Sequence, residues 1–321
     1  MSARLDRRRF LQLGAGALLG TQLAIDHADA RAGADVSEAN LAAGRTRALP
    51  DNNDQRHLIC IYLQGGVDGL ALLPPLRDRA YAALRPRTAV RADRALALAP
   101  DAGVGLHPAF AALAPQLARG QLRGLTALGT SGAGRSHAHA DKRLHAELRR
   151  MAVRWELAAP ERSALPTIAP PSLRARLATV ASAIAAREPL AAVLLPVPGF
   201  DTHAAQARRL ERAFAQLGAE LAELIAALGP SFDHTRVLVV SELGRSLREN
   251  RMAGTDDGEA GAGLLLGGAL SSGGASAPWP DLAALAARDA SSVPVQLELA
   301  DLLASLDREL FAARRPEVSH G

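Results

Sequence analysis

The 321-residue sequence has a single cysteine, a single lysine and few aromatic residues. One cysteine cannot form an intramolecular disulfide. Cys60 lies inside an apolar run, so we expect a buried, unreactive thiol there and not a nucleophile. Lys142 is the only lysine among 37 basic residues, and aromatic residues make up 3% of the chain.

The sequence also lacks a concentration of positive charge and a long apolar run. The net charge is +4, and arginines alternate with acidic residues along the chain. Nucleic-acid binding needs a concentrated basic face, so we predict no nucleic-acid partner. The apolar segment from Leu13 to Ile25 is shorter than the roughly 20 residues of a membrane span and is interrupted by glycines. We therefore expect no stable membrane span.

The N-terminus instead carries the features of an export signal. Arg7 and Arg8 form a pair that is followed, after one residue, by Phe10 and Leu11, which is the twin-arginine pattern. A modest apolar segment and the small-x-small triplet at residues 28–30 follow. We predict a signal peptide over residues 1–30, recognition by the twin-arginine translocase, and a periplasmic or secreted protein.

After the predicted signal peptide, the composition and periodicity of the sequence change twice. Residues 31–56 are polar and without periodicity, which is typical of a flexible leader. From His57 to the C-terminus, apolar runs alternate with helical patterns, so we predict a single α/β domain over residues 57–321. Its strands are expected at 58–63, 122–128, 191–197, 236–240 and 264–266. Its helices are expected at 108–119, 137–158, 204–228 and 295–311. Such alternation favours a mostly parallel central sheet with helices on both faces. We expect the strands at 58–63, 122–128, 191–197 and 236–240 to be adjacent in it.

Asp201 and His203 directly follow one of these predicted strands. Ligand sites of open α/β sheets lie at the carboxyl ends of the strands. A carboxylate and an imidazole are donors that zinc, manganese and iron accept. The alternative is that Asp201 or Thr202 caps the following helix.

Other strand ends carry polar residues as well. Asp68 lies in a Gly-Gly-x-Asp-Gly turn, and Glu242 directly follows the run 236–240. Asp256 and Asp257 lie in a glycine-bounded loop that could also be a solvated acidic turn. Together these carboxylates would form a negatively charged pocket that needs a cation.

The start of the helix predicted at 137–158 is a further candidate site. Ser136 and Arg135 follow a glycine-rich loop, where free backbone N–H groups could bind an anion. Ser136 could equally be only an N-cap. Helical spacing places His137, Asp141 and His145 on one face of this helix, either as ligands or as a solvent-facing histidine face.

These motifs, in this order, resemble the twin-arginine-exported family called domain of unknown function 1501, from His57 to about Phe311. The resemblance rests on the segments 62–70, 106–109, 135–137, 199–206, 239–245 and 254–256. That family is similar in fold to the alkaline phosphatase and sulfatase superfamily. The resemblance therefore implies a three-layer α/β/α sandwich, alkaline-phosphatase-like, and a metal-dependent hydrolase of small anionic phosphate or sulfate esters.

The resemblance also implies roles for individual residues. Asp68, Asp256 and Asp257 would hold one metal ion, and Asp201 and His203 would hold a second. Glu259 could add to the second set, and Glu242 competes with Asp256 for its role. Ser136 would be the nucleophile, with Arg135 beside the substrate anion.

The chain departs from the family pattern where Asp257 and Glu259 replace histidines. An oxygen-rich ligand set favours magnesium, calcium or manganese over zinc. The change is either a rearrangement of the ligands or the decay of a site. The alternative functions are a non-catalytic exported binding or assembly protein that retains the fold, and a purely structural envelope protein.

The export prediction can be tested directly. Replacing Arg7→Lys together with Arg8→Lys should leave the precursor in the cytoplasm, because the arginine pair is the recognition element. Cell fractionation and immunoblotting measure the outcome, with Arg9→Lys as the matched control. Mature double mutant in the periplasm would contradict the prediction.

Overall fold

The computed structural model describes residues 55–98, 103–132, 136–158, 172–188, 190–268, 270 and 273–311. The predicted signal peptide, most of the predicted leader, and Arg135 lie outside the described residues. Within them, one seven-stranded sheet has the order β10-β4-β9-β6-β1-β5, and β11 also pairs with β4. Its strands are β1 (His57–Leu63), β4 (Leu122–Gly129), β5 (Ala192–Val197), β6 (Thr235–Ser241), β9 (Gly261–Leu266), β10 (Gly274–Ala275) and β11 (Leu297–Glu298).

The sheet is mixed but mostly parallel, which confirms the predicted α/β class. β1 lies parallel between β5 and β6, so that Ile61 pairs with Leu195 on one side and Val239 on the other. The expectation that β4 adjoins these strands is wrong, because β9 lies antiparallel between β4 and β6. Two successive antiparallel pairings restore the direction of β4, so the carboxyl ends of β1, β4, β5 and β6 share one edge.

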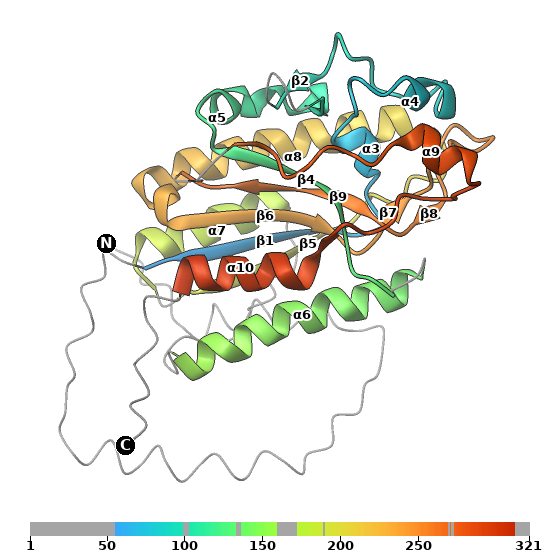
Figure 1. Cartoon of the computed structure of the whole chain (residues 1–321). Coiled ribbons are helices and arrows are strands. Elements are labelled where there is room, and N and C mark those ends of the chain that lie inside the picture. The colour runs from blue at the N-terminus through green and yellow to red at the C-terminus, as the bar shows by residue number, and fades with distance from the viewer. Residues whose placement is uncertain are drawn as a thin grey trace, which may run out of the picture.

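Helices cover both faces of this sheet (Figure 1). Alternate residues of β1 point to opposite faces, as in any strand. Ile59 and Ile61 belong to the core beneath α8 (Gln206–Leu228), whereas Leu58 and Cys60 belong to the core beneath α6 (His137–Ala158) and α10 (Leu299–Phe311). The side chains of β1 therefore pack into two separate cores, as expected of a strand that is buried on both faces.

The long helices form where the apolar spacing predicts them. In α8, leucine and phenylalanine side chains three or four residues apart are buried, which makes one apolar face. The predicted helix at 108–119 is split into η2 (Pro108–Leu113) and α5 (Ala114–Ala118). The remaining elements, absent from the sequence prediction, are α3 (Gly69–Leu72), α4 (Arg79–Leu84), α7 (Leu173–Ala185), α9 (Leu282–Ala287), η3 (Gly229–His234), β2 (Leu96–Ala97), β3 (Gly105–Leu106), β7 (Gly244–Arg245) and β8 (Asp257–Gly258).

Cys60 is fully buried, as predicted, and its burial raises the pKa of the thiol to about 12. Among the helices that the structure describes, none combines the length and the apolar character that crossing a membrane requires.

His107 is a buried histidine whose pKa the fold lowers. The residue is 8% exposed, its Nδ1 accepts a hydrogen bond from the backbone N–H of Ala109 at 3.2 Å, and its ring meets Phe214 edge-on. Burial disfavours the imidazolium and lowers the pKa to about 4, although the negative charge of Asp68 acts in the opposite direction.

We expect His107 to make the protein less stable in acid. The unfolded imidazole takes up a proton below its ordinary pKa of 6.5, whereas the folded one stays neutral down to about pH 4. The stabilisation is thus fully present above pH 6.5, and the free energy of unfolding falls by about 2 kcal/mol as the pH drops toward 4.5. His107→Asn keeps an acceptor for the Ala109 N–H and cannot ionise, so it should lack this loss in urea titrations at pH 7 and pH 4.5.

The exposed His139 offers a matched control for this comparison. His139→Asn should lose stability in acid as the wild type does. An acid loss in His107→Asn equal to that of the wild type would contradict the assignment.

Candidate metal centre

Four side chains meet at the carboxyl edge of the sheet. His137 begins α6, Asp201 and His203 lie between β5 and α8, and Asp257 begins β8. One donor atom from each of the four lies within 4.8 Å of the others. We call His137, Asp201, His203 and Asp257 the four-residue cluster.

Local backbone geometry brings these residues together. β7 and β8 form an antiparallel pair in which Arg245 and Asp257 are partners. Gly65 has a φ of +110°, and a Cβ atom on it would lie 2.4 Å from the backbone nitrogen of Asp201. A Cβ atom on Gly254 would lie 2.3 Å from the backbone oxygen of His203. Only glycine allows the loops to approach this closely.

The alternative role of Asp201 or Thr202 as a helix cap is not what the structure shows. α8 begins at Gln206, and its N-cap residue is Ala205, which makes no side-chain cap hydrogen bond. The Asp201 side chain instead turns to His203, with 3.0 Å between Oδ1 and Nε2.

The spacing of the donor atoms suits one small cation. His203 Nε2 lies 3.6 Å from Asp257 Oδ1, and His137 Nε2 lies 3.3 Å from Asp257 Oδ2. In a tetrahedral zinc site with bonds of about 2.05 Å, neighbouring ligand atoms are about 3.3 Å apart. The two imidazoles and two carboxylates are therefore donors that a divalent ion accepts, and these two separations are close to those of a tetrahedral site.

Arg245 is the cation that the structure places beside this cluster. Its side chain is fully buried, and Nη2 donates a hydrogen bond of 2.7 Å to Asp201 Oδ1. Nη1 lies 3.2 Å from Asp257 Oδ1. Desolvation raises the pKa of Asp201, but the hydrogen bond and the positive charge of Arg245 outweigh it, so the pKa lies below its ordinary value.

One guanidinium does not balance the carboxylates around it. Asp201, Asp257 and the buried Glu242 carry three negative charges against the one positive charge of Arg245, which leaves −2 when the histidines are neutral. In addition, Asp257 Oδ1 is buried and accepts no hydrogen bond in the described part of the chain. Closely spaced carboxylates without a counter-charge are unfavourable. A divalent cation would cancel the remaining charge and coordinate the Asp257 oxygen that accepts no hydrogen bond.

Asp68, which we predicted to be a ligand, lies outside the four-residue cluster. It is fully buried, and its Oδ2 forms an ion pair with the equally buried Arg85 and accepts a hydrogen bond from Gln206. Its Oδ1 accepts a hydrogen bond from the backbone N–H of Leu70 and caps α3. The structure thus gives Asp68 its own cation and a structural position.

The other predicted acidic ligands lie around the cluster and not in it. Glu242 is buried beside His137, with 3.0 Å between Oε1 and Nδ1. The Asp256 side chain is 70% exposed, and its Oδ1 is 3.7 Å from His203 Nδ1. Glu259 is exposed. Of the six predicted metal ligands, the structure groups Asp201, His203 and Asp257.

The start of α6 contributes His137 to the cluster. Ser136 is exposed, and its carbonyl oxygen accepts hydrogen bonds from the backbone N–H groups of His139 and Ala140, so it begins the helix. The sequence indicated His137 only as part of a motif and of a helix face. The arginine–serine–histidine motif after a glycine-rich loop was the signal for it.

The histidine face of α6 packs against the sheet. Tyr62, near the end of β1, donates a hydrogen bond of 2.6 Å from its hydroxyl group to Asp141 Oδ1. The rings of Tyr62 and His145 meet edge-on at 5.7 Å. Burial and the nearby carboxylates of Glu242 and Asp141 raise the pKa of Tyr62, so its hydroxyl group stays a donor. His137, Asp141 and His145 are all half-buried, so the face is not simply a solvent-facing one.

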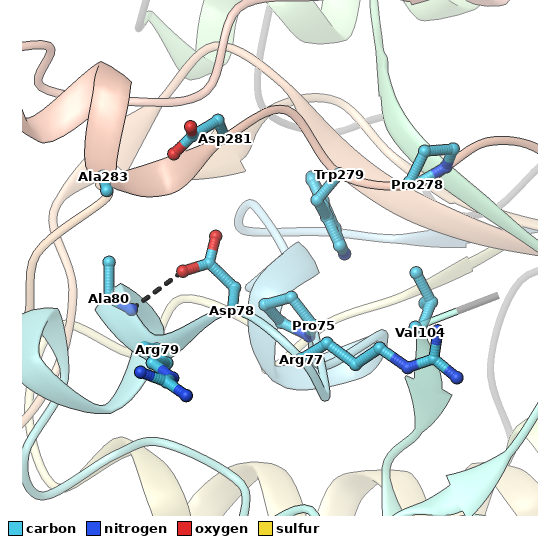
Figure 2. Close-up of a pocket in the computed structure, with 11 residues that line it drawn as sticks. Pro75, Arg77, Asp78, Arg79, Ala80, Val104, Pro278, Trp279, Asp281 and Ala283 are labelled. Carbon is cyan, nitrogen blue, oxygen red and sulfur yellow. Dashed lines mark hydrogen bonds between the residues drawn. The ribbon is translucent and has the colours of Figure 1, made fainter. Parts of the chain in front are cut away.

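A separate cavity of about 530 Å³ lies between α4 and α9 (Figure 2). Asp78 lies on its wall and accepts hydrogen bonds from the backbone N–H groups of Ala80 and Leu282, at the starts of these two helices. Trp279 donates its indole N–H to the backbone oxygen of Leu73. No member of the four-residue cluster lines this cavity, so we place the candidate site at the sheet edge.

Comparison with known proteins supports the resemblance found in the sequence. Residues 172–315 match the model of the family described as "Protein of unknown function (DUF1501)". The matched stretch contains Asp201, His203, Asp257 and Arg245, whereas His137 precedes it. A search of curated proteins gave no match.

Proposed function

We propose that this chain is a metal-dependent hydrolase of phosphate or sulfate esters. The observation that carries the proposal is the four-residue cluster, which gathers two imidazoles and two carboxylates at the ligand-binding edge of an α/β sheet. The helices on both faces of the sheet agree with the alkaline-phosphatase-like architecture that the resemblance implies. We also propose that the chain reaches the periplasm or the exterior through the twin-arginine pathway.

The residues of the cluster have distinct tasks in this proposal. Asp257 and Asp201 supply negative oxygens, and His137 and His203 supply neutral nitrogens. A bound divalent ion would polarise an ester oxygen and lower the pKa of a water molecule. Arg245 keeps Asp201 ionised and in place, so the carboxylate is ready to bind.

The donor set also bears on which metal would bind. The oxygen-rich set expected from the sequence favours magnesium, calcium or manganese. The structure adds His137 to the group, and two imidazoles favour transition metals over magnesium and calcium. We therefore propose zinc or manganese, with zinc bound more tightly.

A second candidate is a non-catalytic exported binding or assembly protein. The observation in its favour is the inward position of Arg245, which already supplies part of the counter-charge. The exposed position of Ser136, the predicted nucleophile, points the same way. Under this alternative the cluster stabilises the loops and binds no metal.

Two neighbouring aspartates provide a matched test. We expect the purified wild type and Asp256→Asn to contain stoichiometric zinc or manganese and to hydrolyse p-nitrophenyl phosphate or p-nitrophenyl sulfate. Asp257→Asn should lose both properties, because Asp257 lies in the cluster whereas Asp256 is exposed at its margin. Chelator should lower the melting temperature of the wild type and of Asp256→Asn by about 5–10 °C, and that of Asp257→Asn much less.

The outcomes separate the two candidate functions. If no metal copurifies, and if the wild type and Asp257→Asn melt alike with and without chelator, the metal-dependent hydrolase is wrong. That result would favour the binding protein. Metal binding without hydrolysis of either ester would show a metal site without the proposed activity.

A further inference from the structure

Glu242 is a buried carboxylate whose oxygens all face donors from the protein. Its side chain is 3% exposed. Oε1 accepts a hydrogen bond of 2.8 Å from the backbone N–H of Gly65. Oε2 lies 2.9 Å from the hydroxyl group of Ser241, whose single hydrogen also faces the backbone oxygen of Leu63 at 2.7 Å. The remaining partner of Oε1 is His137 Nδ1 at 3.0 Å. Both oxygens of Glu242 therefore lie against protein groups.

The contact with Glu242 fixes the state of the His137 ring. A carboxylate only accepts hydrogen bonds, so Nδ1 of His137 carries the proton that lies between them. In the neutral ring Nε2 then has the lone pair, and Nε2 is the atom that lies 3.3 Å from Asp257 Oδ2. Two electron-rich atoms at this separation are stabilised by a cation that they share.

From this geometry we infer that Glu242 is a positioning residue. It holds His137 in the Nδ1–H tautomer and aims Nε2 at the metal position, and it is not itself a ligand. Ligating histidines commonly donate their other ring N–H group to a carboxylate in this way. The inference rests on the proposed metal site and assigns a role that the sequence left open between Glu242 and Asp256.

The surroundings of Glu242 support this role. Ser241 ends β6, and Gly65 follows β1 beside it, so Glu242 is anchored to the rigid central strands. His137 lies on a separate element, the helix α6. The hydrogen bond between Tyr62 and Asp141 joins the same helix to the sheet one turn further on. Two side-chain contacts thus set the position of α6 relative to the other ligands.

The test uses two substitutions of Glu242 and two readouts. Glu242→Ala removes the acceptor, whereas Glu242→Gln keeps an oxygen that can accept the His137 proton. The first readout is the ring tautomer of His137 in the metal-free full-length protein, from nitrogen–proton NMR spectra at pH 8, assigned by its absence in His137→Gln. The second is the affinity for Co²⁺, from the visible absorption bands of the bound ion. His139→Ala, on the exposed side of α6, is the control.

We expect the wild type, His139→Ala and Glu242→Gln to show the Nδ1–H tautomer. Glu242→Ala should lose it and bind Co²⁺ about 10–100-fold more weakly. Its absorption bands should keep their shape, because the ligands are unchanged. Affinity within a few-fold of the wild type in Glu242→Gln would show that the hydrogen bond, and not a carboxylate–metal bond, is what matters.

Two results would overturn the inference. Glu242→Ala with an unchanged tautomer and unchanged affinity would show that Glu242 does not position His137. Complete loss of binding in Glu242→Gln, with altered absorption bands in Glu242→Ala, would make Glu242 a ligand. A wild type that binds no Co²⁺ instead overturns the proposed function, while the tautomer of the metal-free protein still decides whether Glu242 orients His137.

Discussion

The arrangement of the loops at the carboxyl edge of the sheet depends on the ion pairs and hydrogen bonds of the buried Arg245 guanidinium. It pairs with Asp201 and Asp257 and donates hydrogen bonds to four backbone carbonyl oxygens, those of Gly65, Gly66, Phe200 and Thr255. Three loops, which follow β1 and β5 and precede β8, therefore converge on one cation. Removing a buried charge leaves its partners uncompensated, at a cost of about 3–5 kcal/mol. Arg245 thus brings two carboxylates together without neutralising all of the charge that surrounds them.

Carboxylates at the carboxyl edge of the sheet have two different roles, and the role depends on whether a carboxylate has an arginine of its own or shares one. Asp68 has the cation of Arg85 to itself, is sealed from solvent, and receives further hydrogen bonds from Gln206 and Leu70. Asp201 and Asp257 share one cation, remain partly exposed, and face two imidazoles. The first arrangement is complete as a structural element, whereas the second keeps negative charge that a further cation would balance. Similar acidic residues therefore support stability in one case and form the metal site that we propose in the other.

Much of the fold could be predicted from the sequence because it rests on long, uniform patterns. Strands buried on both faces are continuous apolar runs, and α8 shows a clear apolar spacing. The direction of β9 could not be predicted, since a run of small and apolar residues carries no signal of strand direction. For the site, Asp201, His203 and Asp257 could be nominated from their places after strands and in the acidic loop. The separation of Asp68 from them could not, because it depends on Arg85, a residue on a different element with no local pattern of its own.

In the proposed function, one divalent cation binds between the side chains of the four-residue cluster, His137, Asp201, His203 and Asp257. The most direct test of this proposal is a crystal structure of the protein grown with Zn²⁺ or Mn²⁺, with anomalous diffraction recorded on both sides of the metal's absorption edge. We expect one strong anomalous peak at ligand distances of about 2.0–2.2 Å from donor atoms of these four side chains, with Glu242 hydrogen-bonded to His137 and Asp68 still paired with Arg85. An electron density map at full metal saturation with no anomalous peak in the cluster, or with the peak at Asp68, would contradict it.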